Sequence, residues 1–177
     1  MRDSILSTLF LLCSSVLLSG QTTTRTGQSF PETCIGEWTG TLEIFAGQSR
    51  KSQIELSIRL DAPDSLGYLN YTLVYFGEDK VERRPYTLKP HQRPGYWYID
   101  ENNGTVLQAR VMDRTLTSIF KIKDQVLLSQ WTCQGDTSHW EILVYPDLWE
   151  PVGETEGEEI TASWPLSTQS AVLERVR

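Results

Sequence analysis

The sequence has few of the residues from which enzyme active sites and metal sites are built. Two of its 177 residues are histidines, three are cysteines, and no Gly-x-Ser-x-Gly motif occurs. A nucleophile with its base, a catalytic triad or a metal cluster therefore has little to draw on. We predict a protein that is not an enzyme and that holds no metal or cofactor. An enzyme with an unfamiliar arrangement is the least favoured alternative.

Basic residues are in the minority, with 16 Lys and Arg against 23 Asp and Glu and a formal net charge of −7. Residues 146–177 hold seven of the acidic residues and only two of the basic ones. Nucleic-acid binding needs a basic face that collects phosphates, and this charge distribution leaves none. The segment 147–165, which is rich in Pro, Gly and Glu, is predicted to be an acidic, solvated linker.

Long apolar runs are absent except at the N-terminus. Residues 5–20 form an apolar run that follows Arg2 and precedes a polar stretch, as is typical of a secretory signal peptide. The run is too short and too interrupted by Ser and Thr for a membrane span, which needs about 20 mostly apolar residues. We predict a signal peptide at 1–20, a flexible segment at 21–33, and a secreted or periplasmic protein without a stable membrane span. An uncleaved anchor is the alternative.

Export to an oxidising compartment would allow the cysteines to form a disulfide. If Cys13 leaves with the signal peptide, Cys34 and Cys133 remain, and an even pair in an oxidising compartment indicates one disulfide. Such a bond would attach the first predicted strand to the late strands. Two buried free thiols are the alternative.

Between residues 36 and 145 the apolar residues recur with a period of two. The stretch SQIELSIRL, for example, alternates four aliphatic residues with polar ones, which is typical of an antiparallel strand with one solvated face. Turn signals separate about nine such strands, and no connection is long enough for a crossover helix. The pattern predicts an all-β antiparallel up-and-down meander.

A meander of this size buries its apolar face and loses its exposed edges by closing on itself. We therefore predict a closed barrel at 34–146, with a two-sheet sandwich as the alternative. Residues 166–177 are predicted to form a short helix that begins at Ser167 as its N-cap, or else a frayed tail.

The stretch GEWTG at residues 36–40 opens the first strand and resembles the calycin-like barrels, the lipocalins and fatty-acid-binding proteins among them. The stretch WYIDENNGTVL and the tail SWPLSTQSAVLERV also resemble uncharacterised secreted bacterial proteins of this general shape. In the calycin-like families a Gly-x-Trp motif packs across the closed end of the barrel. The resemblance implies this role for Gly36, Trp38 and Gly40, and it implies a barrel able to bind a ligand.

Ligand contacts are expected from aromatic and polar side chains that converge inside the barrel. The sequence does not decide which face of the strand around Arg110 points into the barrel. If Gln108 and Arg110 point inward, the buried guanidinium charge of Arg110 would need an anionic partner. With Leu107 and its alternates inside, Arg110 is merely exposed. The candidate ligand-binding residues are Tyr71, Tyr75, Trp97, Gln108, Arg110 and Gln130.

These observations favour a secreted lipocalin-like barrel that binds a small hydrophobic or amphipathic molecule in its interior. The alternative is a non-enzymatic structural or interaction protein whose barrel is filled with side chains, because a barrel of this size does one or the other. Neither the ligand nor the oligomeric state follows from the sequence.

Overall fold

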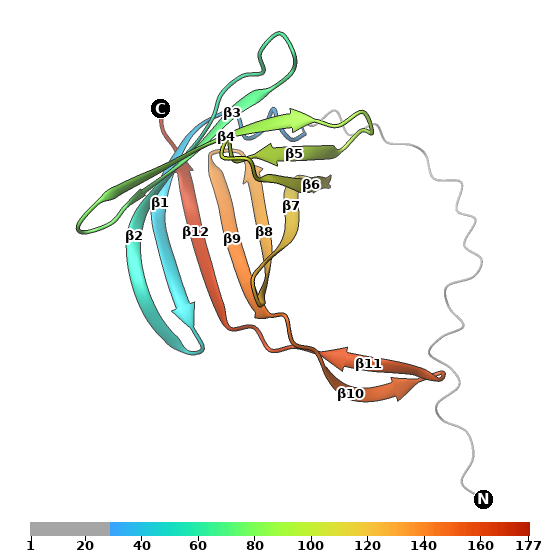
Figure 1. Ribbon diagram of the computed structural model, residues 1–177. Helices are drawn as coiled ribbons and strands as arrows, with labels where there is room; N and C mark the ends of the chain where they lie inside the picture. Colours follow the sequence, from blue (N-terminus) through green and yellow to red (C-terminus); the bar gives the residue numbers. More distant parts are fainter. Residues whose placement is uncertain (1–28) are drawn as a thin grey trace, which may run out of the picture.

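The computed structural model describes residues 29–177, so the predicted signal peptide at 1–20 lies outside the described residues. All the regular structure in this range is β-strand (Figure 1). The strands are β1 Gly36–Ala46, β2 Ser49–Leu60, β3 Leu69–Phe76, β4 Val81–Pro90, β5 Tyr96–Asp100, β6 Val106–Met112, β7 Thr115–Ile122, β8 Gln125–Gln134, β9 Thr137–Pro146, β10 Glu150–Thr155, β11 Glu158–Ala162 and β12 Ser167–Arg175. Within residues 29–177 no helix is long and apolar enough to cross a membrane.

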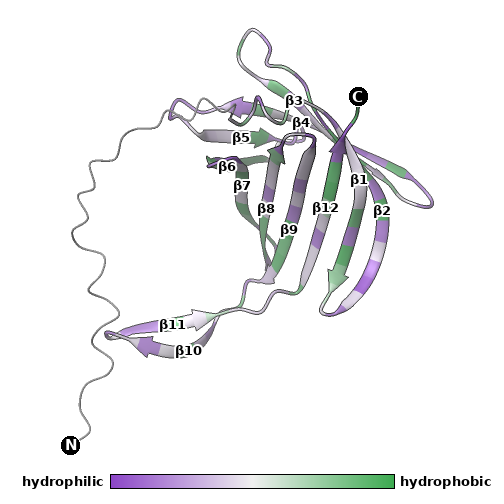
Figure 2. Cartoon of the chain, turned by 180° about the vertical axis from the view of Figure 1, so that it is seen from behind, coloured by the Kyte–Doolittle hydropathy of each residue, from purple (hydrophilic) through white to green (hydrophobic). Residues whose placement is uncertain are grey.

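Ten of these strands form a closed antiparallel barrel in the order β1-β12-β9-β8-β7-β6-β5-β4-β3-β2. Several strands show the alternation that the period-two pattern predicts. On β2, for example, Leu56, Ile58 and Leu60 are buried while Glu55 and Arg59 are exposed. Figure 2 shows polar and apolar residues following one another along the barrel strands. The barrel itself, predicted from the sequence, is confirmed.

The last strand corrects two expectations. Residues 167–175 form β12, not the predicted helix, and the barrel therefore has ten strands instead of about nine. β12 pairs with β1 on one side and with β9 on the other. Without it both neighbours would present an unpaired edge, and filling that gap outweighs the local helix signals.

The segment predicted as a linker contains structure of its own. β10 and β11 pair as a hairpin around a turn at Glu156 and Gly157, both with positive φ. The hairpin is inserted between β9 and β12 and projects from the barrel (Figure 1). We call residues 150–162 the acidic hairpin, because they carry five glutamates and no basic residue.

The two ends of the barrel differ. At one end the segment before β1 covers the opening, and a disulfide joins Cys34 to Cys133 near the end of β8, with 5.3 Å between the Cα atoms. The other end carries the turns between β1 and β2, β3 and β4, β5 and β6, and β7 and β8, together with the base of the acidic hairpin. We call these the closed end and the open end.

Candidate functional site

The closed end is organised around Trp38. Its side chain is fully buried, and its indole Nε1 donates a hydrogen bond to the carbonyl oxygen of Cys34 at 2.9 Å. The guanidinium carbon of Arg175 lies 4.0 Å from the centroid of the indole ring. Arg175 also donates from Nη1 to the oxygen of Ile35 at 2.6 Å and from Nη2 to the oxygen of Thr33 at 2.9 Å. One arginine thus ties the last strand to the first strand and to the segment before it.

The two glycines of GEWTG leave room for this arrangement. A Cβ at Gly40 would lie 2.3 Å from the carbonyl oxygen of Val172 on the neighbouring strand. Gly36 has a φ of +129°, and a Cβ there would lie 2.7 Å from Nη1 of Arg175. Gly36, Trp38 and Gly40 therefore all lie at the closed end, where the resemblance to calycin-like barrels places them.

Aromatic packing completes the closed end. Phe30, which precedes β1, is buried with its ring centroid 5.6 Å from that of Trp97 and 6.2 Å from that of Trp131, both edge-on. Trp97 therefore packs among aromatic side chains at the closed end. It was expected among the ligand contacts, but it does not line the cavity described next.

Beyond this packing the barrel holds a cavity of about 380 Å³. Its wall is mostly aliphatic and aromatic. Tyr71 stacks on Trp131 with 5.2 Å between ring centroids and 17° between planes. Tyr75 meets Trp140 edge-on at 6.5 Å. The apolar and aromatic side chains of the lining are Leu42, Ile44, Ile54, Tyr71, Leu73, Tyr75, Tyr86, Ile99, Leu107, Leu116, Phe120, Ile122, Leu127, Trp131, Trp140 and Ile142.

A polar cluster lies on the β4 side of the cavity mouth. Arg84 Nε donates to Glu82 Oε1 at 2.7 Å, and the guanidinium carbon lies 4.8 Å from the centroid of the Tyr75 ring. Lys80 Nζ approaches the second oxygen of Glu82 at 3.7 Å. One carboxylate thus lies between two cations. Glu101, a second carboxylate of the lining, offsets the net positive charge of these three residues. The remaining polar side chains of the lining are Glu101, Ser118, Ser129 and Gln169.

The cavity environment changes the acidity of these groups. Burial raises the pKa of the Tyr75 hydroxyl to about 12, with the nearby Arg84 opposing the shift. Burial also raises the pKa of Tyr71 and of Tyr86. The hydroxyls therefore stay protonated at neutral pH and can donate hydrogen bonds. Hydrogen bonding to Arg84 lowers the pKa of Glu82, so this carboxylate is ionised.

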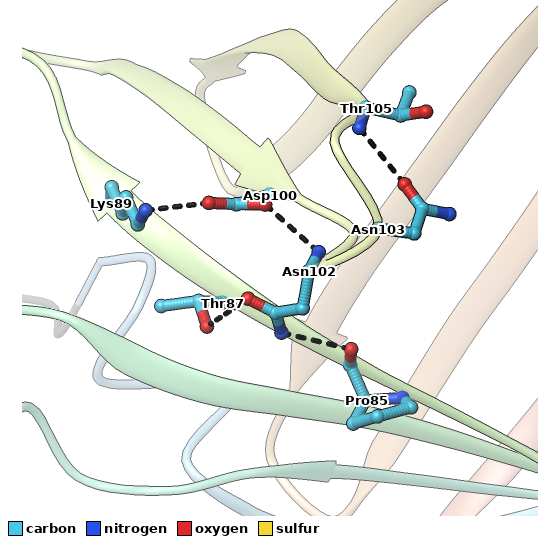
Figure 3. A network of polar contacts seen from close by, with 7 residues as sticks. All are labelled: Pro85, Thr87, Lys89, Asp100, Asn102, Asn103 and Thr105. Carbon is cyan, nitrogen blue, oxygen red and sulfur yellow. Dashed lines mark hydrogen bonds and ion pairs between the residues drawn. The ribbon is translucent and has the colours of Figure 1, made fainter.

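Figure 3 shows the polar contacts that hold the turn between β5 and β6 against β4. Asn102 donates from its backbone nitrogen to Asp100 Oδ1 at 2.8 Å and from Nδ2 to the carbonyl oxygen of Pro85 at 3.0 Å. Thr87 Oγ1 donates to Asn102 Oδ1 at 3.2 Å, and Lys89 Nζ lies 2.6 Å from Asp100 Oδ2. These contacts attach the turn to β4, the strand that carries the polar cluster.

The structure separates the six candidate ligand residues. Tyr71 and Tyr75 line the cavity. The sequence left the inward face of β6 undecided, and the structure turns Gln108 and Arg110 outward. Gln130 on β8 also lies on the outer face, so these three candidate residues do not contact the cavity. The inward neighbours on β6 and β8 are Leu107, Ala109, Ser129 and Trp131. Apolar residues occupy both faces of β6, so its sequence alone does not show which side chains point inward. Its pairing register with β5 and β7 determines this.

Sequence reasoning missed the polar cluster. Glu82, Arg84 and Tyr86 lie in the most basic local stretch of the sequence, and none of them was among the candidate ligand residues. The usable signal is alternation: these three residues precede the buried Leu88 in steps of two, so they share its inward face. Among residues 29–177 no cluster of His, Cys, Asp or Glu could hold a metal ion.

Comparisons with protein-family models and with curated proteins find no match. Among solved structures, a protein of unknown function from the DUF3598 family of Nostoc punctiforme is 16% identical, with a TM-score of 0.56 over 82% of this chain and 48% of that one. The S-type phycobiliprotein lyase CPES from Guillardia theta is 10% identical, with a TM-score of 0.57 over 82% of this chain and 90% of that one. The chain spans about half the length of the DUF3598 protein. At these identities the likeness shows a shared barrel fold.

Proposed function

We propose that the barrel binds one small amphipathic molecule in its interior. The observation that carries this proposal is the cavity of about 380 Å³, which is apolar and aromatic along most of its wall and has three charged side chains in its lining, Glu82, Arg84 and Glu101. Small-molecule sites have volumes of roughly 300–1,000 Å³ and combine an apolar wall with a few polar groups. A barrel filled by its own side chains, the alternative from the sequence, would leave no such space.

The chemistry of the mouth favours a ligand with a hydrogen-bond-accepting polar group, such as a carboxylate. Glu82 accepts from Nε of Arg84, and Tyr86 lies within hydrogen-bonding reach of the same guanidinium, so the remaining N–H groups of Nη1 and Nη2 are left for a ligand. The hydroxyls of Tyr75 and Tyr86 are additional donors beside it. A guanidinium recognises a carboxylate with two parallel hydrogen bonds, and partial burial strengthens them. The apolar body would lie against Tyr71, Trp131 and Trp140.

The proposal also includes the compartment in which the protein works and whether it is an enzyme. The disulfide between Cys34 and Cys133 is compatible with an oxidising compartment, and the predicted signal peptide agrees with export. We propose a secreted or periplasmic binding protein, not an enzyme. The fold neighbour named as a phycobiliprotein lyase makes a bilin a reasonable probe beside fatty acids.

A dye-displacement titration tests the proposal. A hydrophobic fluorescent dye is bound to the protein and displaced by fatty acids or by a bilin. Leu127→Trp places a larger side chain in the cavity, whereas Leu128→Trp changes the outward-facing neighbour on the same strand. We expect the first variant to weaken dye binding about tenfold or more and the second to leave it within about twofold. Equal dye affinity in both variants, or no dye uptake by the wild type, would contradict interior binding.

A further inference from the structure

The acidic hairpin is a surface without a partner in the isolated chain. Its two strands are exposed along their whole length, and their charge comes entirely from glutamates. Large apolar side chains accompany the charge: Trp149 is 53% exposed, Val152 62% and Trp164 84%. Clustered exposed apolar residues of this size mark interaction surfaces, and a two-stranded hairpin gains stability when it packs against another element.

A surface of opposite charge lies on the outer wall of the barrel near its closed end. It is centred on Tyr96, with the guanidinium carbon of Arg93 4.5 Å from the ring centroid and that of Arg110 5.0 Å from it. His91 adds an aromatic ring at 6.0 Å from Tyr96 and 5.4 Å from Tyr98. We call these five residues the Tyr96 platform.

The platform has free cationic groups. Within residues 29–177 neither Arg93 nor Arg110 forms an ion pair, and both side chains are exposed. The neighbouring carboxylate of Asp100 is already paired with Lys89 at 2.6 Å (Figure 3). Arginines held over aromatic rings suit a partner that brings carboxylates and indole rings together. The acidic hairpin and its flanking tryptophans supply both.

The positions of the two surfaces indicate that the hairpin binds the platform of a second copy of the chain. Arg93 lies in the connection between β4 and β5 at the closed end, whereas the acidic hairpin leaves the open end. In the structure a chain's own hairpin therefore leaves the barrel at the end opposite its own platform. In both views β5, β6 and the hairpin lie on the same side of the barrel (Figures 1 and 2). Two copies placed side by side in opposite directions bring each hairpin to the other copy's platform.

We propose that the protein forms a two-fold symmetric dimer in which the acidic hairpin of each copy lies on the Tyr96 platform of the other. The contact occurs twice, as a two-fold axis requires, and it closes the assembly at two subunits. The contact involves none of the cavity-lining residues, so it is independent of the proposed ligand binding.

Charge reversal on each surface tests the proposal by analytical ultracentrifugation over a range of concentrations. One variant is R93E/R110E, and the other is E154K/E158K/E159K. Each should weaken self-association about tenfold or more, because like charges then face each other in both contacts. An equimolar mixture of the two variants should regain association close to that of the wild type, because both contacts of the mixed dimer again join opposite charges. High salt should weaken the wild-type dimer.

Matched controls make each outcome decisive. R83E reverses an exposed arginine on β4 toward the open end, outside the Tyr96 platform, and should leave the dimer constant within about twofold. W164S removes the most exposed tryptophan without touching the barrel core and should weaken the dimer. A wild type that stays monomeric, variants that dimerise normally, or folded variants that fail to associate on mixing would overturn the proposal.

Discussion

Arg175 lies over Trp38 with 4.0 Å between its guanidinium carbon and the centroid of the indole ring. The pair joins the last barrel strand to the first, which are neighbours in the closed sheet. Arg175 adds two hydrogen bonds to backbone carbonyl oxygens of the segment that leads into β1. The closed end is thus held by one charged side chain that is only partly exposed.

Replacing this arginine should destabilise the fold. Arg175→Ala removes a cation–π contact and two charge-assisted hydrogen bonds, and we expect the free energy of unfolding to fall by about 2–4 kcal/mol. Arg177→Ala is the matched control, since that side chain is 85% exposed and its one ion pair, with Asp136, lies at the surface. Urea denaturation of both variants measures the difference. Equal stability would show that the contact over Trp38 contributes nothing.

Gly40 should not tolerate a side chain. A Cβ at this position would lie 2.3 Å from the carbonyl oxygen of Val172, which is backbone of a paired strand and cannot give way easily. We expect Gly40→Ala to cost about 2 kcal/mol or more and to lower the melting temperature by several degrees. Gly153→Ala, where nothing lies within 4 Å of the added carbon, should melt with the wild type. Calorimetry on the two alanine variants distinguishes them.

The disulfide should contribute strongly to stability. Cys34 and Cys133 are 99 residues apart, and closing a loop of that length is worth about 4–5 kcal/mol in the chain-entropy model, as an upper figure. C34S/C133S should therefore unfold at a clearly lower urea concentration than the oxidised wild type. The reduced wild type should behave like the double variant. A reduced protein as stable as the oxidised one would contradict the prediction.

Arg84 and its neighbour Arg83 offer a direct test of the polar group at the cavity mouth. Arg84 lines the cavity, whereas Arg83 lies on the outer face of the same strand. Arg84→Met should weaken binding of a fatty acid about tenfold or more and should affect the corresponding alcohol much less. Arg83→Met should leave both affinities unchanged. Arg110→Ala should also leave them unchanged, because Arg110 lies outside the barrel.

Tyr75 gives the protein a stability loss at high pH. Burial raises its pKa to about 12, against about 10 in an unfolded chain. Between these values the unfolded state has lost the proton and the folded state still holds it. The contribution of the protonated Tyr75 hydroxyl to stability is therefore fully present below about pH 10. As the pH rises toward 12 the free energy of unfolding falls by up to about 1.4 kcal/mol per pH unit. Tyr75→Phe should reduce this slope in urea titrations, while Tyr71 and Tyr86, whose pKa values burial also raises, keep part of it. An unchanged slope would contradict the assignment.

The barrel could be predicted from the sequence because period-two alternation, clearest on β2 and β3, recurs between short turn signals over about a hundred residues. β12 could not, because residues 167–175 combine a possible N-cap with late basic residues, and only the gap between β9 and β1 makes them a strand. The acidic hairpin was missed for a related reason. Its composition is that of a solvated linker, and the pairing of β10 with β11 has no alternating apolar face to reveal it.

The candidate site was predictable only in part. Tyr71 and Tyr75 follow from the clear alternation on β3, which places them with the buried leucines of that strand. On β6 both faces are apolar, so the position of Arg110 depends on the register with the neighbouring strands. Arg84 was overlooked because charged residues on successive positions of β4 conceal which of them face inward.

The position of β12 in the barrel sets an order for folding during synthesis. β1 and β9 expose their edges until residues 167–175 have been made, because the strand that separates them comes after every other strand of the barrel. Closure therefore depends on contacts between positions such as Trp38 and Arg175, which are far apart in the chain. Contacts of this kind form slowly, and open edges pair readily with other chains. A chain interrupted before β12 should accordingly be far more prone to aggregation than one that lacks only the acidic hairpin.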